Sequence, residues 1–363
     1  MRNSEKSAAV VQPALQTVLL RAWSKRSTCA ATLWPISQLY RLLSALRRQL
    51  YRWGVLKSHQ VDALVLTVGN VIVGGAGKTP TVIAIVRHLQ EKNIRVGVVS
   101  KGYGRTSNAC LQVQPDSTAS LVGDEPLLIQ QATAAPVFVA DKRITAAQAL
   151  MAYHPKTEII VCDDGLQHYA LYRDFEICVF DDRGCGNNFL LPAGPLREPW
   201  PRRPVSQAGQ DNNRLLVLHT GNQPAFAGYR AQRSLSPFAK RADGSLVSLN
   251  SLATADAPPL LALAGIAQPE SFFSMLRNLG LPLHGTLALP DHYDFDSFSR
   301  SNYEGYQLIC TEKDASKLWP IEPNALAVSL NLNIETSFFS ALDQLIYQRL
   351  RAKLSSNYGH QIT

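Results

Sequence analysis

A glycine loop between an apolar run and a helical pattern constrains this chain more than any other feature. The loop is Gly74-Gly75-Ala76-Gly77-Lys78-Thr79-Pro80, and it lies between the apolar residues 63–68 and the helical residues 81–86. Glycines allow successive backbone N–H groups to face one anion, and the N-terminus of a helix adds partial positive charge. Lys78 can reach a β/γ phosphate oxygen, and the Thr79 hydroxyl can hold Mg²⁺. The sequence therefore predicts a nucleoside triphosphate site.

This loop differs from the usual phosphate-loop motif in its first glycine. The usual spacing places Gly at position 72, where this chain has Ile72, and the loop is instead the compact Gly-Gly-x-Gly-Lys-Thr form preceded by Asn70. The simpler alternative is a glycine-rich turn before an unrelated helix. Strand, loop and helix follow in the order that phosphate binding needs, which favours the nucleotide interpretation.

Strand and helix patterns alternate from residue 63 to residue 181, within the first half of the chain. Apolar strand patterns occur at residues 63–68, 95–100, 137–139, 158–162 and 175–181, while residues 106–120 are polar and are expected to be a loop. Such alternation predicts an α/β fold, a P-loop NTPase-like parallel sheet with helices on both faces. A Pro- and Arg-rich segment then precedes a second, smaller α/β domain. The expected parts are 1–60, 61–205, 215–328 and 329–363, the last a C-terminal helix.

The N-terminal part is basic and amphipathic. The net charge of the chain is +8, and no acidic residue lies between Glu5 and Asp62. Apolar residues recur there at helical spacing, with arginines largely on another face: Ile36, Leu39, Tyr40, Leu43, Leu46, Leu50 and Trp53. Such a helix can lie in a membrane interface and attract anionic lipid, or pack its apolar stripe on the main domain, or bind nucleic acid. No recognised nucleic-acid module accompanies it, so nucleic acid is not expected as a partner.

Cysteine spacing and hydropathy exclude other classes. The six cysteines are scattered without a Cys-x-x-Cys pair, which argues against a zinc site and favours free thiols in a reducing compartment. No apolar stretch approaches the roughly 18–20 residues that cross a bilayer. The start of the chain is too short and interrupted for a signal-peptide core, and it is expected to be an extension.

Two groups of polar residues are candidates for the chemistry. Asp163 and Asp164 follow an apolar strand, as Walker-B carboxylates that hold Mg²⁺ do, although an Asp-Asp-Gly turn can also be a solvated loop. Phosphoryl transfer also needs a group that orients or deprotonates the acceptor hydroxyl. The candidates are Asp124, Glu125, His168, Asp291 and His292, and their spacing does not decide which of them converge.

Eight segments in a fixed order resemble one enzyme family. They are Gly69-Asn70 with the phosphate loop, Ser100-Lys101-Gly102-Tyr103-Gly104-Arg105, Val122-Gly123-Asp124-Glu125-Pro126, Asp163-Asp164-Gly165-Leu166-Gln167-His168, Arg183-Gly184-Cys185-Gly186-Asn187, Leu191-Pro192-Ala193-Gly194-Pro195-Leu196-Arg197-Glu198-Pro199, Asp291-His292-Tyr293 and Thr311-Glu312-Lys313-Asp314. Together they resemble the tetraacyldisaccharide 4′-kinases, the lipid A 4′-kinases of Gram-negative bacteria. The resemblance covers residues 35–350, and the Pro-Ala-Gly-Pro-Leu-Arg-Glu-Pro block is its most specific part.

The resemblance implies transfer of a phosphate from ATP, with Mg²⁺, to the 4′-hydroxyl of an acylated glucosamine disaccharide 1-phosphate. It implies the cytoplasmic face of the inner membrane as the location, and it favours the membrane interpretation of the basic helix. By the same resemblance, Asp124 with His292 forms the catalytic dyad, in which Asp124 is the base. Further active-site positions implied by the family are Asn70, His168, Arg197 and Glu198. The family commonly has Arg where this chain has Lys101. A lysine keeps the positive charge but cannot make the bidentate contacts of an arginine.

Two other function classes remain possible from the residues alone. One is a membrane-associated ATPase of the compact phosphate-loop class that acts on a partner protein. That class usually carries Lys before its Gly-Gly pair, where this chain has Val73. The other is a nucleotide-binding module without catalysis. Replacement of Asp124 by Asn discriminates them, because only a kinase should lose phosphotransfer while it keeps its nucleotide affinity.

Overall fold

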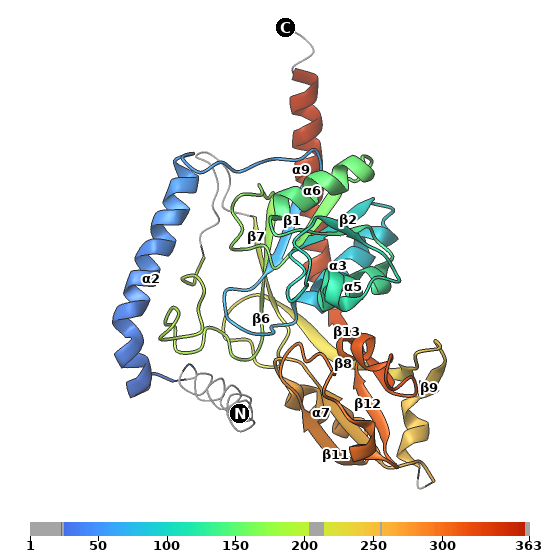
Figure 1. The fold of residues 1–363 in the computed structure, drawn as a ribbon. Coiled ribbons are helices and arrows are strands. Elements are labelled where there is room, and N and C mark those ends of the chain that lie inside the picture. The colour runs from blue at the N-terminus through green and yellow to red at the C-terminus, as the bar shows by residue number, and fades with distance from the viewer. Residues whose placement is uncertain (1–22, 24, 203–213, 255, 360–363) are drawn as a thin grey trace. The chain divides into compact units, whose positions relative to one another are not determined.

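The chain forms a mixed α/β fold whose strands pair mostly in parallel, which confirms the predicted fold class. Figure 1 shows this fold in a computed structural model that describes residues 23, 25–202, 214–254 and 256–359. Two compact units make up the chain. The first unit is Met1–Lys78, Glu158–Ala231 and Ile334–Thr363, and the second unit is Thr79–Thr157 and Gln232–Asn333. The division into four consecutive domains stays a prediction, and the predicted N-terminal extension lies outside the described residues.

A parallel sheet with the order β5-β1-β6-β7 forms the centre of the first unit. The elements of this unit, all but β5 labelled in Figure 1, are α2 (Thr28–Arg52), β1 (Leu64–Gly69), β5 (Ile159–Asp163), β6 (Phe175–Phe180), β7 (Leu215–His219) and α9 (Thr336–Gly359). Every residue of β1, β5 and β6 is buried, which explains the continuous apolar runs in the sequence. Val68 pairs with Asp163, so the loops that follow β1 and β5 begin at the same edge of the sheet.

Three elements run from one unit into the other: α3 (Lys78–Glu91), β8 (Tyr229–Lys240) and β13 (Leu326–Ile334). The remaining elements belong to the second unit. They are β2 (Val96–Ser100), β3 (Leu111–Val113), α4 (Ala119–Val122), α5 (Asp124–Thr133), β4 (Val137–Val139), α6 (Arg143–Tyr153), β9 (Leu246–Ser248), β10 (Leu260–Ala264), α7 (Pro269–Asn278), β11 (Leu283–Ala288), β12 (Gln307–Thr311), α8 (Glu312–Leu318) and the short 3₁₀ helices Leu249–Ala253 and Arg300–Tyr303.

The predicted loop at residues 106–120 is wrong in part. It contains β3, which pairs antiparallel with β4 at Leu111↔Val139 and Val113↔Val137, and the start of α4. Three residues with Gln112 in the middle are too short and too polar to display a strand period. The antiparallel pairing with the buried strand β4 therefore forms this strand, which local sequence preference does not reveal.

A second parallel sheet, β11-β10-β12-β13, carries a core on each face. Phe273 and Leu276 of α7 lie in the core on one face. On the other face the core includes Leu318 of α8 and Phe295 from the segment after β11. The second core therefore holds α8 and the segment around residue 295 against the same sheet.

The helix α2 turns polar side chains toward the protein and apolar ones outward. Ser37 donates to the carbonyl of Leu190 (2.7 Å), and Tyr40 donates to the carbonyl of Arg197 (2.9 Å). Large apolar side chains are between 46% and 64% exposed at Trp34, Ile36, Leu39, Leu42, Leu43 and Leu46. These exposures do not fit the alternative in which the apolar stripe packs on the main domain. In the described part of the chain, no helix has the length and apolar character needed to cross a membrane.

Candidate active site

Four consecutive carbonyl oxygens of the phosphate loop accept hydrogen bonds from side chains. Arg183 donates to the carbonyls of Val73 (3.0 Å) and Gly75 (3.3 Å), Asn70 donates to Gly74 (3.1 Å), and Thr220 donates to Ala76 (2.9 Å). Asp181 in turn holds the Arg183 guanidinium at 2.8 Å. A phosphate is bound by backbone N–H groups. Because side chains of the protein hold the carbonyl oxygens, the N–H groups of the loop can face an anion. Gly74 has a φ of 96° and lies against Arg183, where a Cβ would be 3.0 Å from the guanidinium.

The departure of the motif at Ile72 has a packing reason. Ile72 is only 1% exposed and lies in a core cluster with Leu166 and Leu196. It also forms an isolated antiparallel bridge with Leu196. A glycine here would leave a void in that core. The isoleucine packs the phosphate loop against the segment that carries Arg197 and Glu198.

The two predicted Walker-B carboxylates differ in environment. Asp163 ends β5 and is 1% exposed, whereas Asp164 follows it with a φ of 45° and a side chain that is 30% exposed. Lys78 Nζ lies 3.7 Å from Asp164 Oδ1, and Arg197 Nη1 lies 3.3 Å from Asp164 Oδ2. The structure thus brings Lys78, Asp164 and Arg197 together at the end of the first sheet.

The donor set fits a magnesium ion that is held mainly by nucleotide. Mg²⁺ in kinases is usually bound by one or two carboxylates together with phosphate oxygens and water. Asp163 and Asp164 supply two adjacent carboxylates, and Thr79, the predicted hydroxyl ligand, is buried at the start of α3. Among the described residues there is no group of three or more His, Cys, Asp or Glu that could hold a metal by itself.

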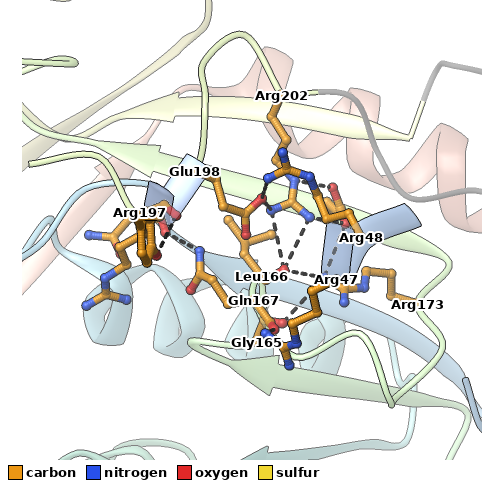
Figure 2. Close-up of polar contacts among 12 residues, drawn as sticks. Arg47, Arg48, Gly165, Leu166, Gln167, Arg173, Arg197, Glu198 and Arg202 are labelled. Carbon is orange, nitrogen blue, oxygen red and sulfur yellow. Dashed lines mark hydrogen bonds and ion pairs between the residues drawn. The ribbon is translucent and has the colours of Figure 1, made fainter. Parts of the chain in front are cut away.

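Behind the carboxylates lies a buried network of ion pairs, which sequence reasoning missed (Figure 2). Arg202 pairs with Glu176 at 2.9 Å and with Glu198 at 3.0 Å, and Arg173 pairs with Glu176 at 3.3 Å. Both arginines also donate to the carbonyl of Leu166 (Figure 2). Glu198 therefore holds an arginine, and the network supports the loop that follows Asp163 and Asp164. His168, the other predicted position in that loop, is partly buried and donates its backbone N–H to Gly165.

In the second unit, Asp124 and His292 form the predicted pair. Asp124 is the first residue of α5, and His292 Nδ1 lies 3.0 Å from Asp124 Oδ2. The ring of Tyr103 lies 5.1 Å from the imidazole of His292. Of the other base candidates, Asp291 pairs with Lys313 at 3.0 Å, and Glu125 is partly buried without taking part in this pair.

Charge and burial act in opposite directions on the Asp124 carboxyl. Burial alone would raise its pKa, but hydrogen bonds from His292 and Lys317 and the charge of Lys313 hold the pKa below the usual range. Asp124 is thus ionised at neutral pH and can accept a proton. The pair lines a cavity of about 980 Å³ in the second unit, together with Tyr103 and Lys317.

The predicted site residues fall into two groups. Asn70, Gly74 to Lys78, Asp163, Asp164, His168, Arg197 and Glu198 belong to the first unit, and Thr79, Pro80, Asp124 and His292 to the second. Sequence reasoning missed Arg183, Thr220, Arg202 and the two lysines of α8. Arg183 and Lys313 lie in two of the eight segments that carry the family resemblance. Their place in these segments is the sequence signal that could have identified them as functional residues.

Comparisons with known proteins identify the family. Residues 29–351 match the family described as LpxK, tetraacyldisaccharide-1-P 4′-kinase. The tetraacyldisaccharide 4′-kinase of Polaromonas naphthalenivorans (strain CJ2) is 53% identical over 96% of this chain and 100% of its own length. That of Acidovorax sp. (strain JS42) is 52% identical over 93% of this chain and 95% of its own. The crystal structure of LpxK from Aquifex aeolicus in complex with ATP has a TM-score of 0.73 and 28% identity, over 88% of this chain and 98% of that one. The chain therefore belongs to the tetraacyldisaccharide 4′-kinase family and is a kinase.

Proposed function

We propose that this chain transfers the γ-phosphate of ATP to the 4′-hydroxyl of a tetraacyl glucosamine disaccharide 1-phosphate. The observation that carries the proposal is the contact of 3.0 Å between Asp124 and His292, two residues that lie far apart in the sequence. An ionised carboxylate held by an imidazole is suited to accept a proton from a sugar hydroxyl. As the bond from the sugar oxygen to the γ-phosphorus forms, the bond to ADP breaks and Asp124 takes the hydroxyl proton.

The phosphate loop binds and orients the nucleotide in this proposal. Lys78 supplies a positive charge to the β/γ phosphate oxygens, and Asp163, Asp164 and Thr79 would hold Mg²⁺. When bound, Mg²⁺ neutralises charge on the transferred phosphate. Arg197 lies 3.3 Å from Asp164 and orients that carboxylate. The acylated acceptor follows from family membership, because the names of the relatives specify it.

Transfer of labelled γ-phosphate tests this function. Wild type, Asp124→Asn and Lys78→Ala are compared with ATP, Mg²⁺ and the tetraacyl disaccharide 1-phosphate in detergent micelles. We expect labelled lipid with wild type, a loss on the order of a hundredfold or more with Asp124→Asn, and nucleotide affinity that Asp124→Asn leaves intact. ATP hydrolysis without labelled lipid would instead support the partner-coupled ATPase. Full activity of Asp124→Asn would remove the dyad from the mechanism.

We also propose that α2 places the enzyme on an anionic lipid surface, at the cytoplasmic face of the bacterial inner membrane. The exposed apolar face of α2 and the exposed cations Arg41 and Arg52 support this, because apolar side chains enter the interface while cations meet anionic headgroups. The proposed substrate is itself a lipid, so a surface-bound enzyme would meet it directly.

Flotation with lipid vesicles tests the surface. The double variant Leu42→Glu/Leu46→Glu should lose about tenfold or more in binding to vesicles that contain anionic lipid, since each buried apolar side chain contributes about 1.5–3 kcal/mol. Leu279→Glu is the matched control, because Leu279 is a leucine of similar exposure (48%) outside α2. Equal binding of both variants would refute the role of α2.

A further inference from the structure

The short helix α8 places two lysines against the Asp124–His292 pair. Lys313 and Lys317 are separated by one helical turn, so they lie on the same side of α8. They come from the Thr311-Glu312-Lys313-Asp314 segment and its continuation. Thr311 accepts a hydrogen bond from the backbone N–H of Asp314 and thereby caps the helix. The position of both lysines is thus fixed by the start of α8.

Lys317 connects the two halves of the dyad. Its Nζ lies 2.8 Å from Asp124 Oδ2 and 3.3 Å from each of the carbonyl oxygens of His292 and Tyr293. An ammonium group has three N–H donors, and these three acceptors use all of them. The side chain is 17% exposed, so water competes little for these contacts. Lys317 therefore ties α5 to the segment that carries His292.

The same contacts distinguish the two oxygens of the Asp124 carboxylate. His292 Nδ1 and Lys317 Nζ both approach Oδ2, at 3.0 Å and 2.8 Å. Within the described residues, both side-chain hydrogen bonds to Asp124 thus end on one oxygen. Oδ1 is consequently the oxygen that can accept the proton of an acceptor hydroxyl.

Lys313 acts on the other side of the imidazole. Its Nζ lies 3.0 Å from Asp291 Oδ1 and 3.4 Å from His292 Nε2, whereas Asp291 Oδ1 lies 3.9 Å from Nε2, which is too far for a hydrogen bond. An ammonium can only donate, so this contact requires a lone pair on Nε2. The proton of the neutral ring is then on Nδ1, from where it is donated to Asp124. Lys313 thus favours the tautomer in which His292 orients the carboxylate.

We propose that Lys317 and Lys313 are positioning residues of the dyad, Lys317 by directing Asp124 Oδ1 toward the acceptor hydroxyl and Lys313 by selecting the tautomer of His292. This inference rests on the proposed role of Asp124 as the base. Among the described residues, the charged and titratable groups that act on Asp124 or on its partner are His292, Lys317 and Lys313, with Asp291 beside Lys313 and 3.9 Å from His292 and with Tyr103 against the imidazole. The lysines have a further effect, because their charges help to keep the pKa of Asp124 low.

The pH dependence of the reaction tests the role of Lys317. A base whose pKa is held low stays active at lower pH, and protonation of Asp124 sets the acid limb of the profile. Lys317→Met should therefore lower kcat by on the order of ten- to a hundredfold and move the acid limb to higher pH, with KM for ATP changed little. Lys317→Arg keeps a cation and should restore part of both effects. Lys142→Met is the control, because Lys142 is an exposed lysine of the same unit at the start of α6.

Nitrogen NMR of His292 tests the role of Lys313. In the wild type, the Nε2 resonance should be that of an unprotonated ring nitrogen, and Lys313→Met should give a mixture of tautomers. If Lys317→Met does not fold, the tautomer of His292 in Lys313→Met still tests the proposal.

An acid limb and kcat of Lys317→Met that equal those of Lys142→Met, or an unchanged tautomer in Lys313→Met, would overturn the inference. Asp124→Asn, measured in parallel, separates two failures. If it keeps full phosphotransfer, the proposed base is wrong. If it loses activity while the lysine variants behave as wild type, only the positioning role is wrong.

Discussion

Removal of Arg202 should destabilise the protein strongly, because two buried carboxylates depend on it. The side chain of Arg202 is 2% exposed, and those of its partners Glu176 and Glu198 are 2% and 5% exposed. In Arg202→Met, Glu176 keeps Arg173 at 3.3 Å, whereas the ion-pair partner that Glu198 keeps among the described residues is Arg48, at 4.0 Å. Breaking a buried pair in this way costs about 3–5 kcal/mol, since one charge stays buried without compensation. This is a large part of a typical free energy of unfolding of about 5–15 kcal/mol.

A second substitution that removes the uncompensated charge should reduce the loss. Arg202→Met/Glu198→Gln should recover part of the loss, because the buried charge is removed.

Urea unfolding of wild type and the two variants measures these differences in unfolding free energy by linear extrapolation. Arg41→Met is the control for the substitution, because Arg41 is exposed on α2 in the same unit, and a change within about 0.5 kcal/mol is expected. A loss below about 1 kcal/mol for Arg202→Met, or no recovery of stability in Arg202→Met/Glu198→Gln, would refute the reasoning. Either result would mean that Glu198 is solvated once Arg202 is gone.

Three further predictions concern the backbone before Asp124, the thiols and a buried acid. Gly123→Ala should cost about 1–3 kcal/mol and lower phosphotransfer, because Gly123 has a φ of 95° and a Cβ would lie 2.9 Å from Gly102 Cα; thermal unfolding and the kinase assay measure this. A maleimide should label exposed Cys29 much faster than Cys178, where burial raises the pKa of the thiol, as peptide mass spectrometry would show; equal rates would contradict the structure. Burial also raises the pKa of Asp314, so the buried carboxylate destabilises the folded state increasingly as the pH rises from the unfolded pKa through the raised folded pKa. Asp314→Asn should gain stability relative to wild type over that pH range in urea titrations.

Local patterns sufficed to predict the elements around the nucleotide loop. Buried parallel strands are continuous apolar runs, so the sequence predicts β1 and β5. Asp163 is predicted as a site residue because it stands at the end of β5. The contact between Asp124 and His292 was expected from family resemblance alone, because spacing could not select among five candidate bases. The contacts of Arg202 and Lys317 could not be predicted, since they depend on which distant segments the fold brings together.

The orientation of α2 shows a different limit. Helical periodicity assigned Ile36, Leu39 and Leu43 to one face, and these residues do lie together among the exposed ones. Periodicity does not say which face meets the protein, however. Ser37 and Tyr40 decide this in the structure, through hydrogen bonds to backbone carbonyls that a sequence pattern does not contain.

The attachment of α2 to main-chain atoms has a consequence for protein engineering. Ser37, Tyr40 and Arg47 bind the carbonyls of Leu190, Arg197 and Gln167, so deletion of the helix would leave the two loops after β5 and β6 without these donors. Replacing the outward leucines with polar residues leaves every one of these hydrogen bonds in place. A kinase that is easy to handle without detergent should therefore be sought by redesign of the outer surface of α2, with the whole helix retained.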